Sequence, residues 1–214
     1  EARAWYPVDD PVHGFDHVER VYRTAEVLAD EVGADLEIVR AAALLHDVEG
    51  AAPHEGDGRS SHEITSAENA RRRLKSEGWQ PERIEAVLHC IRAHRYRGQE
   101  QPQSLEAQVL FDADKLDVLG AFGVARTVAY AVQAGQPVYA PPSERFLERG
   151  ERDPDEPHSA YHEYLFKLRK VRDRLQTDPA KRLADRRERL LHDFFQQLSQ
   201  EAEFADLTDL FPPH

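Results

Sequence analysis

Apolar residues recur at spacings of three and four along most of the chain, and no stretch of useful length alternates apolar with polar residues. This spacing places apolar side chains on one face of a helix, whereas a half-buried strand requires alternation. Glycine, proline and serine residues mark where the segments start and stop. The pattern predicts an all-α fold, with helices over 16–32, 36 to near 50, 61–77, 81–94, 104–116, 120–134, 159–176 and 179–199. It places Ile64 on the apolar face of the third of these helices, and Leu190 and Phe194 on the apolar face of the last.

The length and charge of the chain limit the class of protein that it can be. Its 214 residues suffice for a substantial core, and we expect a single domain over residues 1–214. A net charge of −12 argues against a nucleic-acid partner bound through a broad basic surface. A small anionic substrate remains compatible with this charge, because a bound cation and a few basic residues can make one pocket positive.

The sequence lacks the usual features of a secreted or membrane protein. The single cysteine, Cys90, excludes an intramolecular disulfide bond, and the first residues, EARAWYPVDD, do not resemble a signal peptide. No apolar stretch approaches the roughly 18 residues of a membrane span. We therefore expect a cytoplasmic monomer or homodimer with no membrane partner.

Residues 135–158 are rich in glycine, proline and charged side chains. An unstructured connection of this length is uncommon between neighbouring helices of a compact domain. The sequence therefore predicts a loop or lid over 135–158, followed by C-terminal helices over 159–199 that pack on the core.

Histidine and aspartate residues occupy positions that the helical spacing places toward the core. His46 and Asp47 follow the apolar run AAALL, Asp114 comes four residues after Leu110 on an apolar face, and His17 leads the first helix. A single inward histidine is usually a hydrogen-bonded core residue, but an unpaired inward carboxylate costs several kcal/mol. One divalent cation would account for these residues together, and mixed imidazole and carboxylate ligands suit Mn, Fe, Zn or Ni.

The order of these residues, H…HD…D, resembles the signature of the HD superfamily of metal-dependent phosphohydrolases. The stretches HGFDHVERV, HEITSAENA and DADKLDVLGAFGVARTVAYA resemble its stand-alone bacterial branch, which includes nucleotide pyrophosphohydrolases, and the likeness covers nearly the whole chain. The resemblance implies a helical bundle with a central cation. We expect Mn²⁺, with Mg²⁺, Co²⁺, Ni²⁺, Fe²⁺ or Zn²⁺ as alternatives. The implied metal ligands are His17, His46, Asp47 and Asp114.

Candidate catalytic residues lie beside the implied ligands. A cation with open positions lowers the pKa of a bound water, and Asp47 is placed to accept a hydrogen bond from that water and orient it. His62 would protonate the leaving group or contact a phosphate, with helix capping as the structural alternative. Glu49 is a candidate acid or base, although a solvent-facing glutamate is the simpler interpretation.

Several basic and polar residues near the same motifs are candidates for substrate binding. Arg20 lies one turn after His17, where it would meet a phosphate or pair with a neighbouring acidic residue. Lys115 follows an implied ligand, and the resemblance implies a pocket lysine there. Asp117 is also a candidate for orienting a metal ligand. The full substrate-binding set is Arg20, His94, Arg97, Lys115 and Asp117.

Departures from related enzymes narrow the substrate. The HD enzymes that hydrolyse guanosine tetraphosphate alarmones carry adjacent Glu and Asp three residues beyond the HD pair, where this chain has Gly50 and Ala51. His62 and His94 resemble the extra histidines that hold a second metal in binuclear relatives. A site with two metal ions is therefore an alternative to a site with one.

The activity expected from these features is hydrolysis of nucleoside or deoxynucleoside triphosphates to a monophosphate and pyrophosphate. The alternatives are a 5′-nucleotidase or other phosphomonoesterase, and a non-catalytic sensor that binds nucleotide and metal. The expected partner is a small-molecule nucleotide. Rossmann and Walker fingerprints are missing, so no dinucleotide cofactor is expected.

Overall fold

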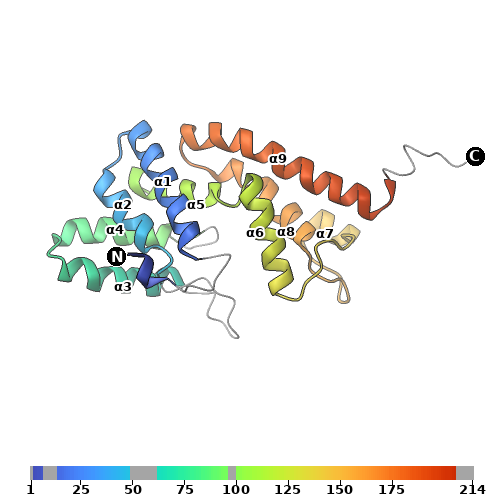
Figure 1. The fold of residues 1–214 in the computed structure, drawn as a ribbon, viewed down its shortest axis with the longest axis horizontal. Coiled ribbons are helices and arrows are strands. Elements are labelled where there is room, and N and C mark those ends of the chain that lie inside the picture. Colours follow the sequence, from blue (N-terminus) through green and yellow to red (C-terminus); the bar gives the residue numbers. More distant parts are fainter. Residues whose placement is uncertain (1, 7–13, 49–61, 96–99, 206–214) are drawn as a thin grey trace, which may run out of the picture. The chain divides into compact units, whose positions relative to one another are not determined.

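The computed structural model describes residues 2–6, 14–48, 62–95 and 100–205. Within these ranges every regular element is a helix, which confirms the predicted all-α fold (Figure 1). The chain forms two compact units, Glu1–Asp117 with Leu175–Leu183 and Val118–Arg174 with Ala184–His214. The expectation of a single domain over 1–214 stays a prediction. None of the described helices has both the length and the apolar character needed to cross a bilayer.

Local sequence signals set the helix ends in the first unit. Gly33 ends the first helix at a φ of 74°, a conformation that carries no steric penalty for glycine. The side chains of Asp35 and Ser104 accept backbone hydrogen bonds at the starts of two further helices, and Pro81 opens another at its first turn. The elements are η1 (Ala2–Trp5), α1 (Phe15–Val32), α2 (Leu36–Leu45), α3 (His62–Ser76), α4 (Pro81–Ala93) and α5 (Leu105–Leu116).

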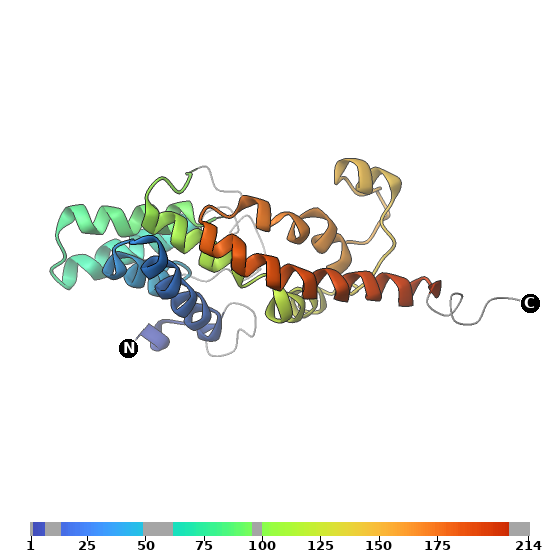
Figure 2. The ribbon, with the colours of Figure 1, turned by 90° about the horizontal axis from the view of Figure 1, so that it is seen from above.

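The helices of the first unit share one apolar core. α1 lies against α2 and α5, and α4 lies against α2, α3 and α5 (Figures 1 and 2). Val21 on α1, Leu88 on α4 and Leu110 on α5 are buried in it. Ile64 was expected on the inward face of α3 and is 49 % exposed, so that prediction is wrong. The buried face of α3 passes instead through Ser66 and the small residues that follow it.

A buried carboxylate ties α5 to the segment that precedes the last helix. Asp112 Oδ1 accepts a hydrogen bond from the N–H of Gln176 at 2.8 Å. Asp112 Oδ2 accepts two more, from the N–H and the hydroxyl of Thr177, each at 2.7 Å. Asp112 and Thr177 are both buried. Asp112 therefore fixes the place where the chain returns to the first unit.

The second unit corrects two predictions. The segment 135–158 was predicted to be a loop, but it contains a short helix because Ser143 caps the turn at its start. The helix predicted over 159–176 ends at Phe166 and gives way to 3₁₀ turns. A lid function for 135–158, and packing of 159–199 on the core, stay predictions. The elements after α5 are α6 (Gly120–Gln133), α7 (Glu144–Arg149), α8 (Ala160–Phe166), η3 (Leu168–Lys170), η4 (Arg172–Arg174) and α9 (Asp178–Ala202), of which α9 begins in the first unit and continues in the second.

The apolar face of α9 differs from the prediction by one residue. Leu190 and Phe194 were expected to face inward, but they are 48 % and 37 % exposed, whereas Leu191 and Phe195 are fully buried. The sequence contains Leu-Leu and Phe-Phe pairs, so either register satisfies a spacing of four. The ring of Tyr164 stacks on Phe195 with 4.6 Å between centroids, and this contact fixes the register.

Candidate metal centre

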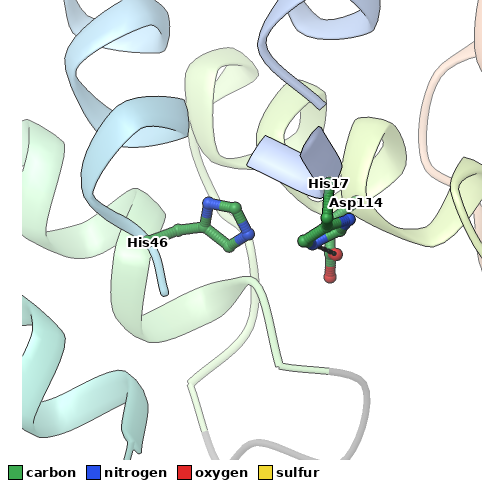
Figure 3. A group of neighbouring side chains, drawn as sticks. All are labelled: His17, His46 and Asp114. Atoms are coloured by element: carbon green, nitrogen blue, oxygen red, sulfur yellow. Dashed lines mark ion pairs between the residues drawn. The ribbon is translucent and has the colours of Figure 1, made fainter. Parts of the chain in front are cut away.

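Helix ends in the first unit bring three of the predicted metal ligands together. His17 lies in the first turn of α1, His46 directly follows α2, and Asp114 lies in the last turn of α5. Figure 3 shows His17 and Asp114 side by side, with the ring of His46 facing them. One potential ligand atom from each residue lies within 4.8 Å of the other two. The residues come from three helices, so their grouping depends on the tertiary fold.

Asp47, His62 and His94 form a second group, in which one potential ligand atom from each residue lies within 4.8 Å of the other two. Asp47 belongs to the second group and also lies close to the first. Its Oδ2 is 3.6 Å from Nε2 of His46 and 3.9 Å from Nε2 of His17. Its Oδ1 is 3.5 Å from Nε2 of His94 and 3.7 Å from Nε2 of His62. Asp47 is therefore placed to contribute one oxygen to each group.

Three histidines turn the same ring nitrogen toward this centre because the other nitrogen is hydrogen-bonded elsewhere. Nδ1 of His46 donates to the carbonyl of Ala43 at 2.9 Å, and Nδ1 of His94 donates to the carbonyl of Ile91 at 2.5 Å. Nδ1 of His17 lies 2.7 Å from a carboxylate oxygen. A carbonyl can only accept, so Nε2 of a neutral ring is left as a lone-pair donor.

The buried Nε2 of His46 also has no hydrogen-bond partner among the residues that the structure describes. A buried nitrogen of this kind calls for a water or an ion as its partner. Nearby carboxylate oxygens and imidazole nitrogens are ligands that first-row divalent metals accept. The residues present therefore fit a divalent cation, which would accept the lone pair of the orphaned nitrogen and offset the charge of the carboxylates.

Burial and charge keep these groups in ligating protonation states. Burial lowers the pKa of His46 to about 4, so its ring is neutral at pH 7. Burial acts to raise the pKa of Asp47, but His46 and His94 outweigh it and hold that pKa well below the usual range. Burial likewise opposes Lys115 and His17 at Asp114, whose pKa is also well below the usual range. The two carboxylates are ionised.

The predicted substrate-binding residues divide into two groups. Lys115 and His94 reach the centre directly, since Nζ of Lys115 donates to Asp114 Oδ2 at 2.5 Å. Arg20 and Asp117 instead contact each other, at 2.7 Å from Nε to Oδ1. Whether any of these residues binds a substrate stays a prediction.

Two predicted site residues, Glu49 and Arg97, lie outside the described residues. The catalytic roles assigned to Asp47 and His62 also stay predictions, although the structure places both residues in the cluster. The side chain of His62 is 16 % exposed, which is more than the side chains of the four implied metal ligands. It lies at the first position of α3.

Sequence reasoning overlooked Glu63 and Tyr6. The buried Glu63 accepts a hydrogen bond from Arg95 at 3.0 Å, and its carboxylate is 3.6 Å from Nδ1 of His62. The hydroxyl of Tyr6 donates to the carbonyl of Leu44 at 2.9 Å, behind the turn that carries the HD pair. The adjacency of Glu63 to His62 was a usable signal, but no motif marks Tyr6.

Comparison with known proteins agrees with this geometry. A family model described as "HD domain" matches residues 14–119. YpgQ from Bacillus subtilis (strain 168) is 30 % identical over 198 residues, which is 91 % of this chain and 86 % of YpgQ. A solved structure of YpgQ in complex with ADP has a TM-score of 0.70 at 28 % identity, and covers 94 % of this chain and 95 % of that chain.

Two further solved structures have the same fold. A Lactobacillus plantarum protein has a TM-score of 0.74 at 31 % identity, over 94 % of this chain and 93 % of that one. An HD-superfamily hydrolase from Bacillus thuringiensis has a TM-score of 0.64 at 30 % identity, over 88 % and 86 %. The residues matched by the family model include all six members of the two groups of candidate metal ligands. The chain belongs to the HD-domain superfamily of metal-dependent phosphohydrolases.

Proposed function

We propose that this protein hydrolyses nucleoside or deoxynucleoside triphosphates to a nucleoside monophosphate and pyrophosphate in the presence of a divalent cation, Mn²⁺ being our choice. The observation that carries the proposal is the orientation of His17, His46 and His94. Each presents Nε2 to a volume bordered by the ionised carboxylates of Asp47 and Asp114. A core without a metal would gain nothing from this arrangement, because burying ionised groups without a compensating partner is costly.

The cation would polarise a phosphoryl oxygen and lower the pKa of the attacking water. Asp47 then orients that water by accepting a hydrogen bond, and its two oxygens lie between the two histidine groups. The water oxygen forms a bond to the α-phosphorus and releases a proton to solvent as the bond from that phosphorus to the bridging oxygen breaks. His62 is our candidate for donating a proton to the leaving pyrophosphate, with Glu49 as the alternative acid or base. Lys115 would exchange its contact with Asp114 for a phosphate oxygen.

The choice of a nucleotide substrate rests on relatives. YpgQ, similar over most of this chain, has been crystallised with ADP, a nucleotide with a pyrophosphoryl group. The second group, Asp47, His62 and His94, makes two cations per chain the specific alternative to one.

A nucleotide and metal screen tests the proposal. Metal-stripped protein is reloaded with Mn²⁺, Mg²⁺, Co²⁺ or Ni²⁺ and given triphosphates or monophosphates, with pyrophosphate and orthophosphate measured separately. We expect triphosphate consumption with pyrophosphate as first product, loss of turnover in Asp114→Asn, and full turnover in Asp30→Asn, an exposed carboxylate on α1. Turnover confined to monophosphates would support the phosphomonoesterase alternative. Nucleotide binding without any turnover would support the sensor.

A further inference from the structure

Asp117 joins two helices of the candidate metal centre. It follows α5 directly, is buried, and lies three residues after Asp114. Its Oδ2 is 2.7 Å from Nδ1 of His17 on α1. Arg20, also on α1, donates to both oxygens of the same carboxylate, from Nε to Oδ1 at 2.7 Å and from a terminal nitrogen to Oδ2 at 3.0 Å. One carboxylate therefore receives a ring nitrogen and a two-point guanidinium contact.

The spacing of these residues gives two side-chain pairs, one turn apart, between α1 and the end of α5. His17 and Arg20 are three residues apart on α1, and Asp114 and Asp117 are three residues apart across the last turn of α5. Residues three apart lie on the same face of a helix. In the first pair, Nε2 of His17 lies 3.4 Å from Oδ1 of Asp114. The second pair, one turn away, is Arg20 with Asp117.

We propose that Arg20 is a positioning residue of the metal centre. By holding Asp117 at two points it fixes the carboxylate that orients His17, and so keeps Nε2 of His17 aimed at Asp114. Arginine suits this task because its planar fork matches a carboxylate at two points, whereas lysine offers a single point charge. A hydrogen-bonded carboxylate behind a metal-ligating histidine fixes the ring orientation, and its loss typically costs about 10–100-fold in metal affinity or activity.

This role differs from the phosphate contact that the sequence suggested for Arg20. A residue that only binds substrate changes KM and leaves the affinity for the cation alone. A residue that acts through Asp117 and His17 changes the affinity for the cation in the absence of any nucleotide. The inference rests on the metal centre of the proposed function but not on the bond that is cleaved.

The test is titration of metal-stripped protein with Mn²⁺ by isothermal calorimetry, without nucleotide. We expect Arg20→Ala to weaken Mn²⁺ binding by about 10–100-fold, and Arg20→Lys to weaken it by less, because the charge remains but the fork is lost. Arg23→Ala is the matched control. Arg23 lies one turn beyond on the same helix, is exposed and forms an ion pair at 2.6 Å with Glu19 of that helix, so we expect no change.

A double variant distinguishes action through Asp117 from a separate effect. If Arg20 acts through this carboxylate, Arg20→Ala should add little to the loss already caused by Asp117→Asn. Additive losses, or wild-type Mn²⁺ affinity in a folded Arg20→Ala, would overturn the inference. If circular dichroism shows that Arg20→Ala does not fold, Arg20→Lys decides, and wild-type affinity there overturns it as well. A wild-type protein that binds no divalent cation would instead refute the metal centre itself.

Discussion

Replacing Asp112 and Asp114, two residues apart on α5, should separate folding from metal binding. Both side chains are buried. Asp112 accepts three hydrogen bonds from Gln176 and Thr177, whereas Asp114 faces His17 and Lys115. We predict that Asp112→Ala destabilises the fold and spares the metal, and that Asp114→Asn has the reverse effect.

The size of the first effect follows from the contacts of Asp112. Hydrogen bonds to a charged acceptor contribute about 1.5–3 kcal/mol each, and two of the three come from the buried Thr177. Burial raises the pKa of Asp112 despite its donors, so part of this gain is offset by the cost of burying the carboxylate. We expect a net loss of about 3 kcal/mol, which corresponds to a fall in Tm of roughly 6–12 °C for a chain of this length.

Thermal unfolding of the metal-free proteins and Mn²⁺ titration of the folded ones measure the two effects. Asp112→Asn is the matched variant for the first, because it keeps one acceptor oxygen and should lose less stability than Asp112→Ala. The reasoning is refuted if Asp112→Ala keeps its Tm and loses Mn²⁺ affinity, or if Asp114→Asn binds Mn²⁺ as tightly as the wild type.

Two further predictions concern the centre. Lys115→Ala should lower kcat/KM by a factor that corresponds to about 1–3 kcal/mol of transition-state stabilisation, with the metal content unchanged. Loss of the metal, or wild-type kinetics, would show that Lys115 does not act on the substrate. Burial lowers the pKa of His46 from 6.5 to about 4, so the unfolded chain binds this proton more readily. The free energy of unfolding of the metal-free protein should therefore decrease by up to about 3 kcal/mol as the pH falls from about 6.5 to 4. Chemical denaturation at several pH values should show a smaller decrease for His46→Gln. The same dependence on pH in His46→Gln and in the wild type would contradict this.

The helices were predictable where the sequence itself starts or stops them. Gly33, Pro81 and Ser104 act through their own backbone or side-chain chemistry, so their effects are visible in a short window. The end of α8 at Phe166 has no such local signal. The face of α9 was mispredicted because the choice between Leu190 and Leu191 depends on what packs against the helix, which a spacing rule does not contain.

The candidate site was predictable as a set of ligands but not as a network. Inward His46 and Asp114 were evident because a titratable side chain on an apolar face needs a partner. The partner of Arg20 was not evident, because Asp117 is 97 residues away in the sequence and reaches Arg20 only when α1 and α5 pack together. Local spacing therefore suggested a phosphate or a neighbouring acidic residue as the partner, where the structure has a carboxylate from another helix end.

The position of bond cleavage tests the central claim most directly. Mn²⁺-loaded protein is incubated with a nucleoside triphosphate in ¹⁸O-labelled water, and the products are separated and weighed by mass spectrometry. Attack at the α-phosphorus predicts one ¹⁸O atom in the nucleoside monophosphate and none in the pyrophosphate. Label in pyrophosphate or in orthophosphate, with an unlabelled monophosphate, would contradict the proposed reaction.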